Sequence, residues 1–323
     1  MRVFITGASG FVGGAAGRHF VSKGFDVRAM SRSEKSDKVL NAMGAAPIRC
    51  DLDNVTPANI DNADLVVHCA AFVEQWGPKD AWRKYNVDGA ARMLAAAKAA
   101  GVKRFIHIST ESVLWSGQSL HNADETYPLA LNSPYPYAAT KAQAEVLAHQ
   151  ANAPGFETII LRPRFIWGPG DTTLLPLIEH MAKTGGWMWV NHGRAQTSTT
   201  HIANLVHAIE LAATQGKGGE AYFILDDGVR SMHEIISGMA AARGVRLPER
   251  SISSGAADFV GAACELAWRT FSLKGEPPLT RFSAMIMSRD SVLNDAKARR
   301  EMGYAPVISV AEGLRQLVAQ GPS

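Results

Sequence analysis

The chain has 323 residues, of which 46% are hydrophobic and 20% charged, and its formal net charge is +3. That length allows a large core and more than one lobe. The basic residues form no long block of like charge, so we expect no nucleic-acid partner. No apolar run reaches the ~20 residues needed to span a bilayer. Three scattered cysteines are typical of reduced thiols and indicate a cytoplasmic protein. The histidines show no metal-ligand spacing, so we expect no metal site.

The first half of the chain alternates short apolar strands with helices. Strands are predicted over residues 2–6, 27–30, 47–50, 64–69, 104–108 and 158–162, and helices over 12–23, 34–43, 81–100 and 136–152. Strands that are apolar throughout are typical of a parallel sheet covered on both faces. We therefore predict an α/β fold with a doubly wound parallel sheet that binds a nucleotide.

The pattern loosens after residue 162. A helix at 202–213 and a strand at 221–225 return to it, and the rest is helix-rich. We assign residues 1–165 and 202–225 to the nucleotide-binding domain, and 166–201 and 226–323 to a smaller substrate-binding lobe. Residues 255–273 are the longest apolar stretch but are interrupted by charges. They predict an amphipathic helix that packs on the core, with a membrane-surface or dimer role as the alternative.

A glycine-rich turn directly follows the first strand. Gly7, Gly10 and Gly13 are spaced by three and join that strand to the first helix. Glycine has no Cβ, so the backbone can approach a phosphate closely, and the helix N-terminus presents free N–H groups to the anion. We predict that a dinucleotide pyrophosphate is bound by Gly7, Ser9, Gly10, Phe11, Val12 and Gly13.

The end of the second predicted strand indicates which dinucleotide is bound. An NAD site usually has an acidic residue there to hold the ribose 2′-hydroxyl. Here the strand is followed by Ser31, Arg32 and Ser33, and Glu34 comes two residues too late. Because Arg32 can pair with a 2′-phosphate, we predict NADP as the preferred cofactor, with NAD as the alternative.

Two side chains of the predicted helix at 136–152 are suited to proton transfer. Tyr137 and Lys141 are four residues apart and therefore share one helix face. A free tyrosine has a pKa of about 10, and a neighbouring ammonium favours the phenolate. We predict Tyr137 as the general acid/base and Lys141 as the group that lowers its pKa. Thr110 and Ser109 follow a strand end, where ligands of such sheets lie, and either hydroxyl can orient the substrate oxygen.

These patterns together resemble the extended short-chain dehydrogenase/reductase superfamily, which also contains the NAD-dependent epimerases and dehydratases. The similarity spans most of the chain. It rests on Thr6-Gly7-Ala8-Ser9-Gly10-Phe11-Val12-Gly13, Asp51-Leu52, His68-Cys69-Ala70-Ala71, Tyr85-Asn86-Val87-Asp88-Gly89, Ser109-Thr110, Tyr137-xxx-Lys141 and Leu161-Arg162-Pro163. The resemblance implies a Rossmann domain followed by a small C-terminal substrate domain.

The resemblance also implies roles for single residues. Further cofactor contacts, from the adenine side to the nicotinamide side, are expected at Asp51, Leu52, Ala70, Ala71, Tyr137, Lys141 and Pro163. Thr110 occupies the position of the family's catalytic Ser/Thr, and Ser109 is the second choice. Family members are often dimers through two helices, here those at 81–100 and 136–152, so we expect a homodimer.

Two departures from the superfamily patterns argue against a nucleotide-sugar substrate. Sugar-nucleotide dehydratases resemble Ser-Thr-Asp-Glu-Val at the active strand, whereas Ser112 occupies the position of that glutamate here. Sugar-nucleotide epimerases usually have an anion-binding arginine shortly before a His-Val pair, whereas only Arg194 lies near His201. An epimerase or dehydratase with tightly held NAD, acting on a sugar nucleotide, is therefore the alternative function.

Other segments, among them 72–77, 162–170 and 201–205, resemble the 3β-hydroxysteroid dehydrogenase-like group. That resemblance implies hydride transfer between the nicotinamide and a secondary alcohol or ketone on an apolar substrate, such as a sterol or steroid, a terpenoid or a long-chain keto compound. A large apolar ligand needs an apolar lining. We predict substrate contacts at Phe72, Trp76, Glu111, Trp167 and Trp187, with a core position as the alternative for Trp187.

Overall fold

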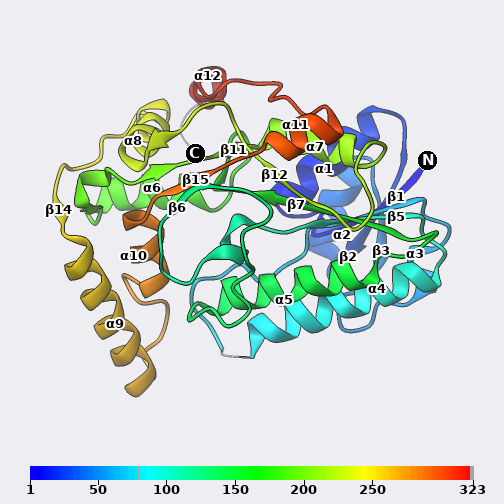
Figure 1. The fold of residues 1–323 in the computed structure, drawn as a ribbon, viewed down its shortest axis with the longest axis horizontal. Helices are drawn as coiled ribbons and strands as arrows, with labels where there is room; N and C mark the ends of the chain where they lie inside the picture. Colours follow the sequence, from blue (N-terminus) through cyan, green and yellow to red (C-terminus); the bar gives the residue numbers. More distant parts are fainter. Residues whose placement is uncertain (79, 321–323) are drawn as a thin grey trace.

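The computed structural model describes residues 1–78 and 80–320. Its centre is a seven-stranded sheet in the order β12-β7-β5-β4-β1-β2-β3 (Figure 1). The strands are β1 (Arg2–Thr6), β2 (Asp26–Ser31), β3 (Ala46–Arg49), β4 (Leu65–His68), β5 (Arg104–Ile108), β7 (Glu157–Pro163) and β12 (Ala221–Ile224). All of these pairings are parallel. The strand order reverses between β1 and β4, and ligands of such sheets bind at the carboxyl ends beside this point.

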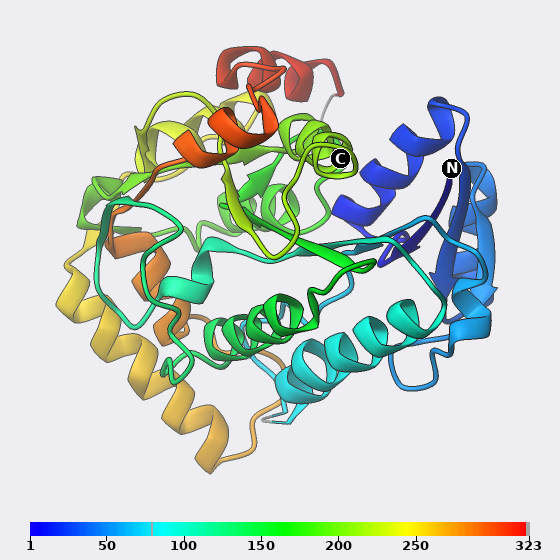
Figure 2. The same ribbon diagram turned by 45° about the vertical axis from the view of Figure 1, so that its right-hand side comes forward.

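Helices cover both faces of this sheet (Figures 1 and 2). One face packs on α1 (Phe11–Ser22), α2 (Glu34–Ala42), α7 (Ile202–Ala212) and α11 (Ala296–Met302), and the other on α3 (Pro57–Ile60), α4 (Gly89–Ala99) and α5 (Pro136–Ala151). Successive side chains of a strand point to opposite faces. Accordingly, Val3 and Ile5 of β1 lie in one apolar core and Phe4 in the other. The predicted α/β class and the doubly wound sheet are confirmed.

The C-terminal half forms a second, helix-rich region around a small sheet. This four-stranded sheet has the order β13 (Arg230–Ser231), β10 (Gln196–Thr197), β15 (Ser291–Leu293) and β6 (Leu120–Ala123). Shorter pairs join β8 (Ile166–Trp167) to β11 (Thr200–His201) and β9 (Trp189–Val190) to β14 (Ser251–Ile252). The helices are α6 (Leu174–Thr184), α8 (Met232–Ala242), α9 (Ser254–Thr270), α10 (Arg281–Ser288) and α12 (Val310–Gln320).

The division of the chain into two domains stays a prediction, and two elements join the regions. β6 comes from the first half of the chain but pairs with β15. α11 comes from the last third but packs Ala298 and Met302 into the core of the large sheet. Within residues 1–78 and 80–320, no helix is both long and apolar enough to cross a membrane.

Candidate active site

The glycine turn lies between β1 and α1, at the carboxyl end of the sheet. Gly7 has a φ of +71°, and its carbonyl oxygen accepts from the Gly10 N–H at 3.0 Å. A Cβ on Gly13 would lie 2.5 Å from that same oxygen. Gly10 precedes α1 without a side-chain cap, so the first N–H groups of the helix keep no side-chain acceptor there. A cradle that a Cβ would fill, next to an uncapped helix N-terminus, fits a dinucleotide pyrophosphate.

A hydroxyl at the end of β1 connects this turn to the end of β4. Thr6 Oγ1 lies 2.8 Å from His68 Nδ1 and accepts from the Ala70 N–H at 3.0 Å. A Cβ on Gly7 would lie 3.0 Å from the Ala70 nitrogen, so the two backbones pass each other closely. The segment with Ala70 and Ala71 therefore lies directly beside the glycine turn.

The residues expected to contact the adenosine half lie after β2 and β3. Arg32 is exposed and forms no ion pair among the described residues. The Ser33 hydroxyl caps α2 by accepting from the Ser36 N–H, and the Ser31 hydroxyl donates to Asp37. Arg32 therefore keeps its charge available, whereas the neighbouring hydroxyls already have partners. Asp51 accepts from the N–H groups of two following residues, and Leu52 is buried in the core.

Tyr137 and Lys141 both lie in the first half of α5 and face the end of β5. Lys141 Nζ is buried and donates to the Ile108 carbonyl oxygen at 2.7 Å. Burial lowers the pKa of Lys141 to about 8. Burial and, after it, the charge of Glu111 raise the pKa of Tyr137, while a hydrogen bond with Thr110 lowers it. The structure thus brings Tyr137 and Thr110 together, whereas the expected effect of Lys141 on the Tyr137 pKa stays a prediction.

The Glu111 carboxylate accepts a hydrogen bond from the Thr110 hydroxyl. Thr110 Oγ1 donates to Glu111 Oε2 at 2.8 Å, and Ser112 Oγ donates to Glu111 Oε1 at 3.2 Å. Arg164 Nη1 also donates to Glu111 Oε1, at 2.6 Å, and both charged side chains are only 3% exposed. Thr110 Oγ1 also accepts from the Ser112 N–H at 3.2 Å, so this hydroxyl is held on two sides within its own segment.

The second candidate hydroxyl, Ser109, belongs to a separate buried ion pair. Ser109 Oγ donates to Glu145 Oε2 at 2.6 Å, and the same carboxylate pairs with Arg162. Burial alone would raise the pKa of Glu145, but the charge of Arg162 and hydrogen bonds hold it at about 2. Ser109 is therefore directed toward Glu145, away from the Thr110 and Tyr137 pair. Neither ion pair was predicted from the sequence.

A short π-helical segment, Arg83–Asp88, precedes α4 where a continuous helix was predicted. Its Asn86 side chain accepts from the Phe72 N–H at 2.7 Å and donates to the Phe72 carbonyl at 3.1 Å and to Thr140 Oγ1 at 3.2 Å. π-helical turns are frequent at functional sites. Here the turn fixes the loop after β4 against the helix that carries Tyr137.

The predicted substrate-contacting aromatics fall into two groups. Phe72 and Trp76 are partly buried in the loop after β4, and Phe72 packs on Trp82 and Tyr85. Trp167 and Trp187 are buried in the apolar core of the C-terminal region. Trp167 Nε1 donates to the buried carboxylate of Asp226, which also accepts from Thr199 Oγ1, the His201 N–H and Asn204 Nδ2.

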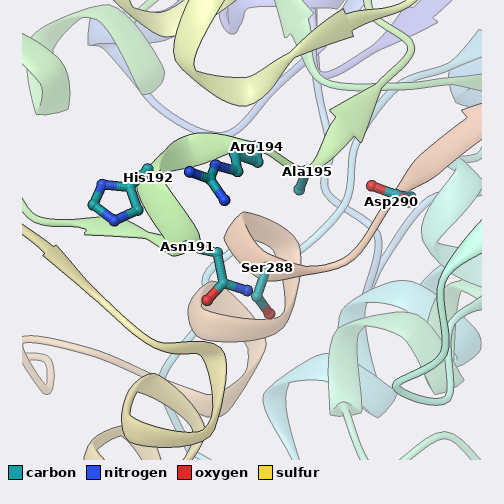
Figure 3. Close-up of a pocket in the computed structure, with 6 residues that line it drawn as sticks. All are labelled: Asn191, His192, Arg194, Ala195, Ser288 and Asp290. Atoms are coloured by element: carbon teal, nitrogen blue, oxygen red, sulfur yellow. The ribbon is translucent and has the colours of Figure 1, made fainter.

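A surface cavity of about 360 Å³ lies in the C-terminal region (Figure 3). Its lining is mostly polar and consists of Asn191, His192, Arg194, Ala195, Ser288 and Asp290. None of the predicted catalytic or cofactor-binding residues belongs to this lining. The cavity is therefore separate from the predicted site residues at the carboxyl end of the large sheet.

The glycine turn after β1 and the Tyr137 and Lys141 pair on α5 lie at the carboxyl end of the sheet, and with the comparisons below they define the class of protein. The protein is a nicotinamide-dependent oxidoreductase of the short-chain dehydrogenase type. Residues 4–253 match the model of the 3-beta hydroxysteroid dehydrogenase/isomerase family, and the chain belongs to this family.

Two curated proteins are similar over nearly the whole chain. One is a 4-hydroxy-2-methyl-3-oxo-4-farnesyl-3,4-dihydroquinoline-1-oxide ketoreductase from Stigmatella aurantiaca, 37% identical over 100% of this chain and 97% of the relative. The other is a 2-alkyl-3-oxoalkanoate reductase from Stenotrophomonas maltophilia, also 37% identical, over 99% of each chain. The UDP-glucuronic acid 4-epimerase from Bacillus cereus, solved in complex with NAD, shares the fold with a TM-score of 0.76, 20% identity and 99% of each chain covered.

Proposed function

We propose that the protein is an NADP-preferring ketoreductase or alcohol dehydrogenase for an apolar substrate, such as a sterol or steroid, a terpenoid or a long-chain keto compound. The observation that carries the proposal is the placement of Tyr137 and Lys141 together on α5, with Lys141 fixed to the Ile108 carbonyl at the end of β5. The names of the two similar reductases point to the same chemistry, because both describe keto compounds with a large apolar part.

The residues of this chain divide the work of proton transfer. When bound, the nicotinamide supplies or accepts the hydride. Tyr137 donates its phenolic proton to the substrate oxygen during reduction and removes it again during oxidation. Thr110 orients the substrate oxygen beside the phenol, and its own hydroxyl is held in place by Glu111 and by the Ser112 N–H. The ammonium group of Lys141 donates to the Ile108 carbonyl oxygen. We propose that it also donates a hydrogen bond to the nicotinamide ribose.

The preference for NADP is supported by the end of β2. Arg32 is exposed and without an ion pair among the described residues, and no carboxylate occupies the two positions before it. A guanidinium there suits a 2′-phosphate, because arginine forms charge-assisted hydrogen bonds with phosphate oxygens. Asp51 and Leu52 border the adenine in this proposal, and the turn from Gly7 to Gly13 binds the pyrophosphate.

An apolar ring from α10 packs against Tyr137. The Phe282 ring of α10 lies 5.9 Å from the Tyr137 ring and 5.3 Å from the Tyr135 ring. We propose that Phe72 and Trp76 extend this lining from the loop after β4. Glu111 acts through Thr110 in this proposal, and Trp167 and Trp187 shape the substrate region from its core.

The proposal also covers the cellular compartment and the oligomeric state. The three unpaired cysteines support a reducing compartment, hence the cytoplasm. α4 and α5 lie side by side on the outside of the large sheet (Figure 2), where a second copy can pack, and we propose a homodimer through these two helices.

Substrate turnover tests the proposal directly. The purified protein is given NADPH or NADH with a panel of steroid, terpenoid and long-chain ketones, and absorbance of the reduced cofactor is followed. We expect loss of NADPH with formation of the matching alcohol. Isomerisation or dehydration of a nucleotide sugar without net consumption of cofactor would instead establish the epimerase or dehydratase alternative.

A further inference from the structure

Helix α9 has an outer face that is apolar and solvent-exposed. Phe259 is 75% exposed and Leu266 68%, and the loop that follows the helix exposes Phe271 and Leu273 to 71% and 45%. Residues 259 and 266 are seven apart, so they share one helix face. The rest of this face consists of glycine, alanine and threonine at positions 255, 256, 262, 263 and 270. A solvent-facing helix face normally carries charged or polar residues instead.

The two carboxylates of α9 are turned away from this face. Asp258 pairs with Arg289 at 2.9 Å, and Glu265 pairs with Arg281 at 2.9 Å, both from the α10 side. The Glu265 side chain is only 12% exposed. The two carboxylates therefore attach α9 to the body of the protein and are neutralised there, which leaves the outer face without an acidic group.

Cations border the exposed apolar side chains at the C-terminal end of the helix. Arg269 is exposed and lies over the Trp76 ring at 5.1 Å, and Lys274 is exposed in the following loop. Neither forms an ion pair in the part of the chain that the structure describes, and Glu276 is the one exposed acid of this loop. An apolar helix face bordered by basic residues is typical of helices that lie in a membrane interface.

The position of α9 connects this face to the active site. α9 forms the outer edge of the molecule in both views, with α10 beside it (Figures 1 and 2). α10 in turn packs Phe282 against Tyr137, and its Ser283 contacts Gln75 in the loop after β4. A single layer, α10, therefore separates the outer helix from the reactive phenol.

We propose that α9 and its following loop dock on the surface of an anionic lipid bilayer, so that an apolar substrate enters from the membrane beside α10. This docking rests on the proposed apolar substrate. A second copy of the chain is less suited to cover this face. The exposed apolar area of Phe259, Leu266, Phe271 and Leu273 is on the order of 500 Å². Stable protein interfaces bury about 800 Å² on each partner.

Vesicle co-sedimentation tests the docking, and it needs no turnover. The full-length protein is mixed with vesicles of equal parts phosphatidylglycerol and phosphatidylcholine, or of phosphatidylcholine alone. We expect binding to the mixed vesicles and at least about tenfold weaker binding for Phe259→Ser/Leu266→Ser, because each buried side chain of this size contributes more than a factor of ten. Arg269→Ala/Lys274→Ala is expected to weaken binding to the anionic vesicles only.

Matched controls separate this docking from a general effect of surface apolarity and from self-association. Val307→Ser/Val318→Ser removes apolar groups that are 59% and 61% exposed elsewhere, and it should bind vesicles like the wild type. Absence of vesicle binding by the wild type, or equal loss in the control, overturns the proposal. Sedimentation velocity showing a dimer that Phe259→Ser/Leu266→Ser dissociates, without vesicle binding, assigns the face to a second copy. Reduction of a short, water-soluble ketone reports separately on the proposed function.

Discussion

Glu111 and Arg164 form a buried ion pair whose carboxylate also fixes the hydroxyl next to the reactive phenol. Arg164 Nη1 donates to Glu111 Oε1 at 2.6 Å, and Thr110 Oγ1 donates to Oε2 at 2.8 Å. The two residues are 53 positions apart in the chain. Through Thr110, a charge pair that faces away from solvent is connected to the proton that Tyr137 exchanges.

Glu111→Gln should move the pH dependence of both reaction directions toward lower pH. The charge of Glu111 raises the pKa of Tyr137, so its removal lowers that pKa, and the unpaired Arg164 cation acts in the same direction. Oxidation needs the phenolate and reduction needs the phenol. In the pH profiles of kcat/KM, the rise of oxidation with pH and the fall of reduction with pH should therefore both move to lower pH. Profiles of kcat/KM against pH measure this shift.

Glu145→Gln is the matched control for this prediction. It also removes a buried, arginine-paired carboxylate that accepts from a hydroxyl after β5, but Glu145 acts on the pKa of Lys141 and not directly on that of Tyr137. An equal shift in both variants would show that loss of any buried charge, rather than the link through Thr110, moves the profile.

Tyr137→Phe should abolish turnover while cofactor binding persists. The substitution removes only the hydroxyl that exchanges the proton, and general acid/base groups contribute about 100-fold or more to rate. Dinucleotide affinity, measured by fluorescence titration, should stay at the wild-type value. Substantial turnover in this variant would remove Tyr137 from its proposed role.

Gly13→Ala should weaken dinucleotide binding and destabilise the fold. Its Cβ would lie 2.5 Å from the Gly7 carbonyl oxygen, and overpacking of this kind costs about 1–3 kcal/mol. Because ~1.4 kcal/mol is a factor of ten in affinity, a cost of this size carried into binding would raise Kd by about 5- to 150-fold. Gly255→Ala, whose Cβ would meet no atom within 4 Å, is the control and should leave Kd unchanged. Isothermal titration measures both variants.

Arg32→Ala should reduce the affinity for NADPH and leave that for NADH unchanged. Loss of a charge-assisted contact to the 2′-phosphate removes about 1.5–3 kcal/mol, which corresponds to roughly a 10- to 100-fold increase in the KM for NADPH. Lys35→Ala, an exposed neighbouring cation, should have a small effect on either cofactor. Similar losses for NADPH and NADH in Arg32→Ala would refute the NADP preference.

Acid should unfold the wild type partly through Glu145. Its pKa is about 2 in the folded protein, against an ordinary value of 4.5, so its stabilising contribution is complete above pH 4.5 and is lost as the pH falls toward 2. Glu145→Gln should lower the free energy of unfolding by about 3 kcal/mol near neutral pH, since it leaves Arg162 buried without its partner. The variant should also lose less stability than the wild type as the pH falls from 4.5 toward 2. Denaturant unfolding at several pH values provides the measurement.

Local patterns were sufficient for the parts of the site that one segment forms by itself. The β1-turn-α1 unit was predicted from glycine spacing within 13 residues, and α5 was predicted with both reactive side chains on one face. These elements depend on backbone sterics and helix periodicity, which neighbouring residues determine. The seven-stranded parallel sheet followed from the alternation of apolar strands and helices.

Features that depend on distant partners had no comparable signal. β6 reads Leu-His-Asn-Ala, a weak strand sequence, and it becomes a strand because Leu120 donates to Asp290 and pairs with Ser291. The ion pairs of Arg162 and Arg164 were missed too, although two arginines in or just after a buried strand require partners. Apolar composition alone does not distinguish a core tryptophan from a ligand-lining one: Trp167 and Trp187 both lie in an apolar core cluster, and their contact with substrate stays a prediction.

The carboxylate of Asp226 limits how this protein can be re-engineered. Its four donors come from β8, β11, the start of α7 and the residue before β11, so it connects the end of β12 to segments on both sides of the region boundary. A chimera that takes the C-terminal region of a relative to change substrate choice would have to carry Trp167 and Asn204 along with Asp226. A graft that replaces only one of the three would leave a buried charge or amide without its partner, and such chimeras should misfold before their specificity is ever tested.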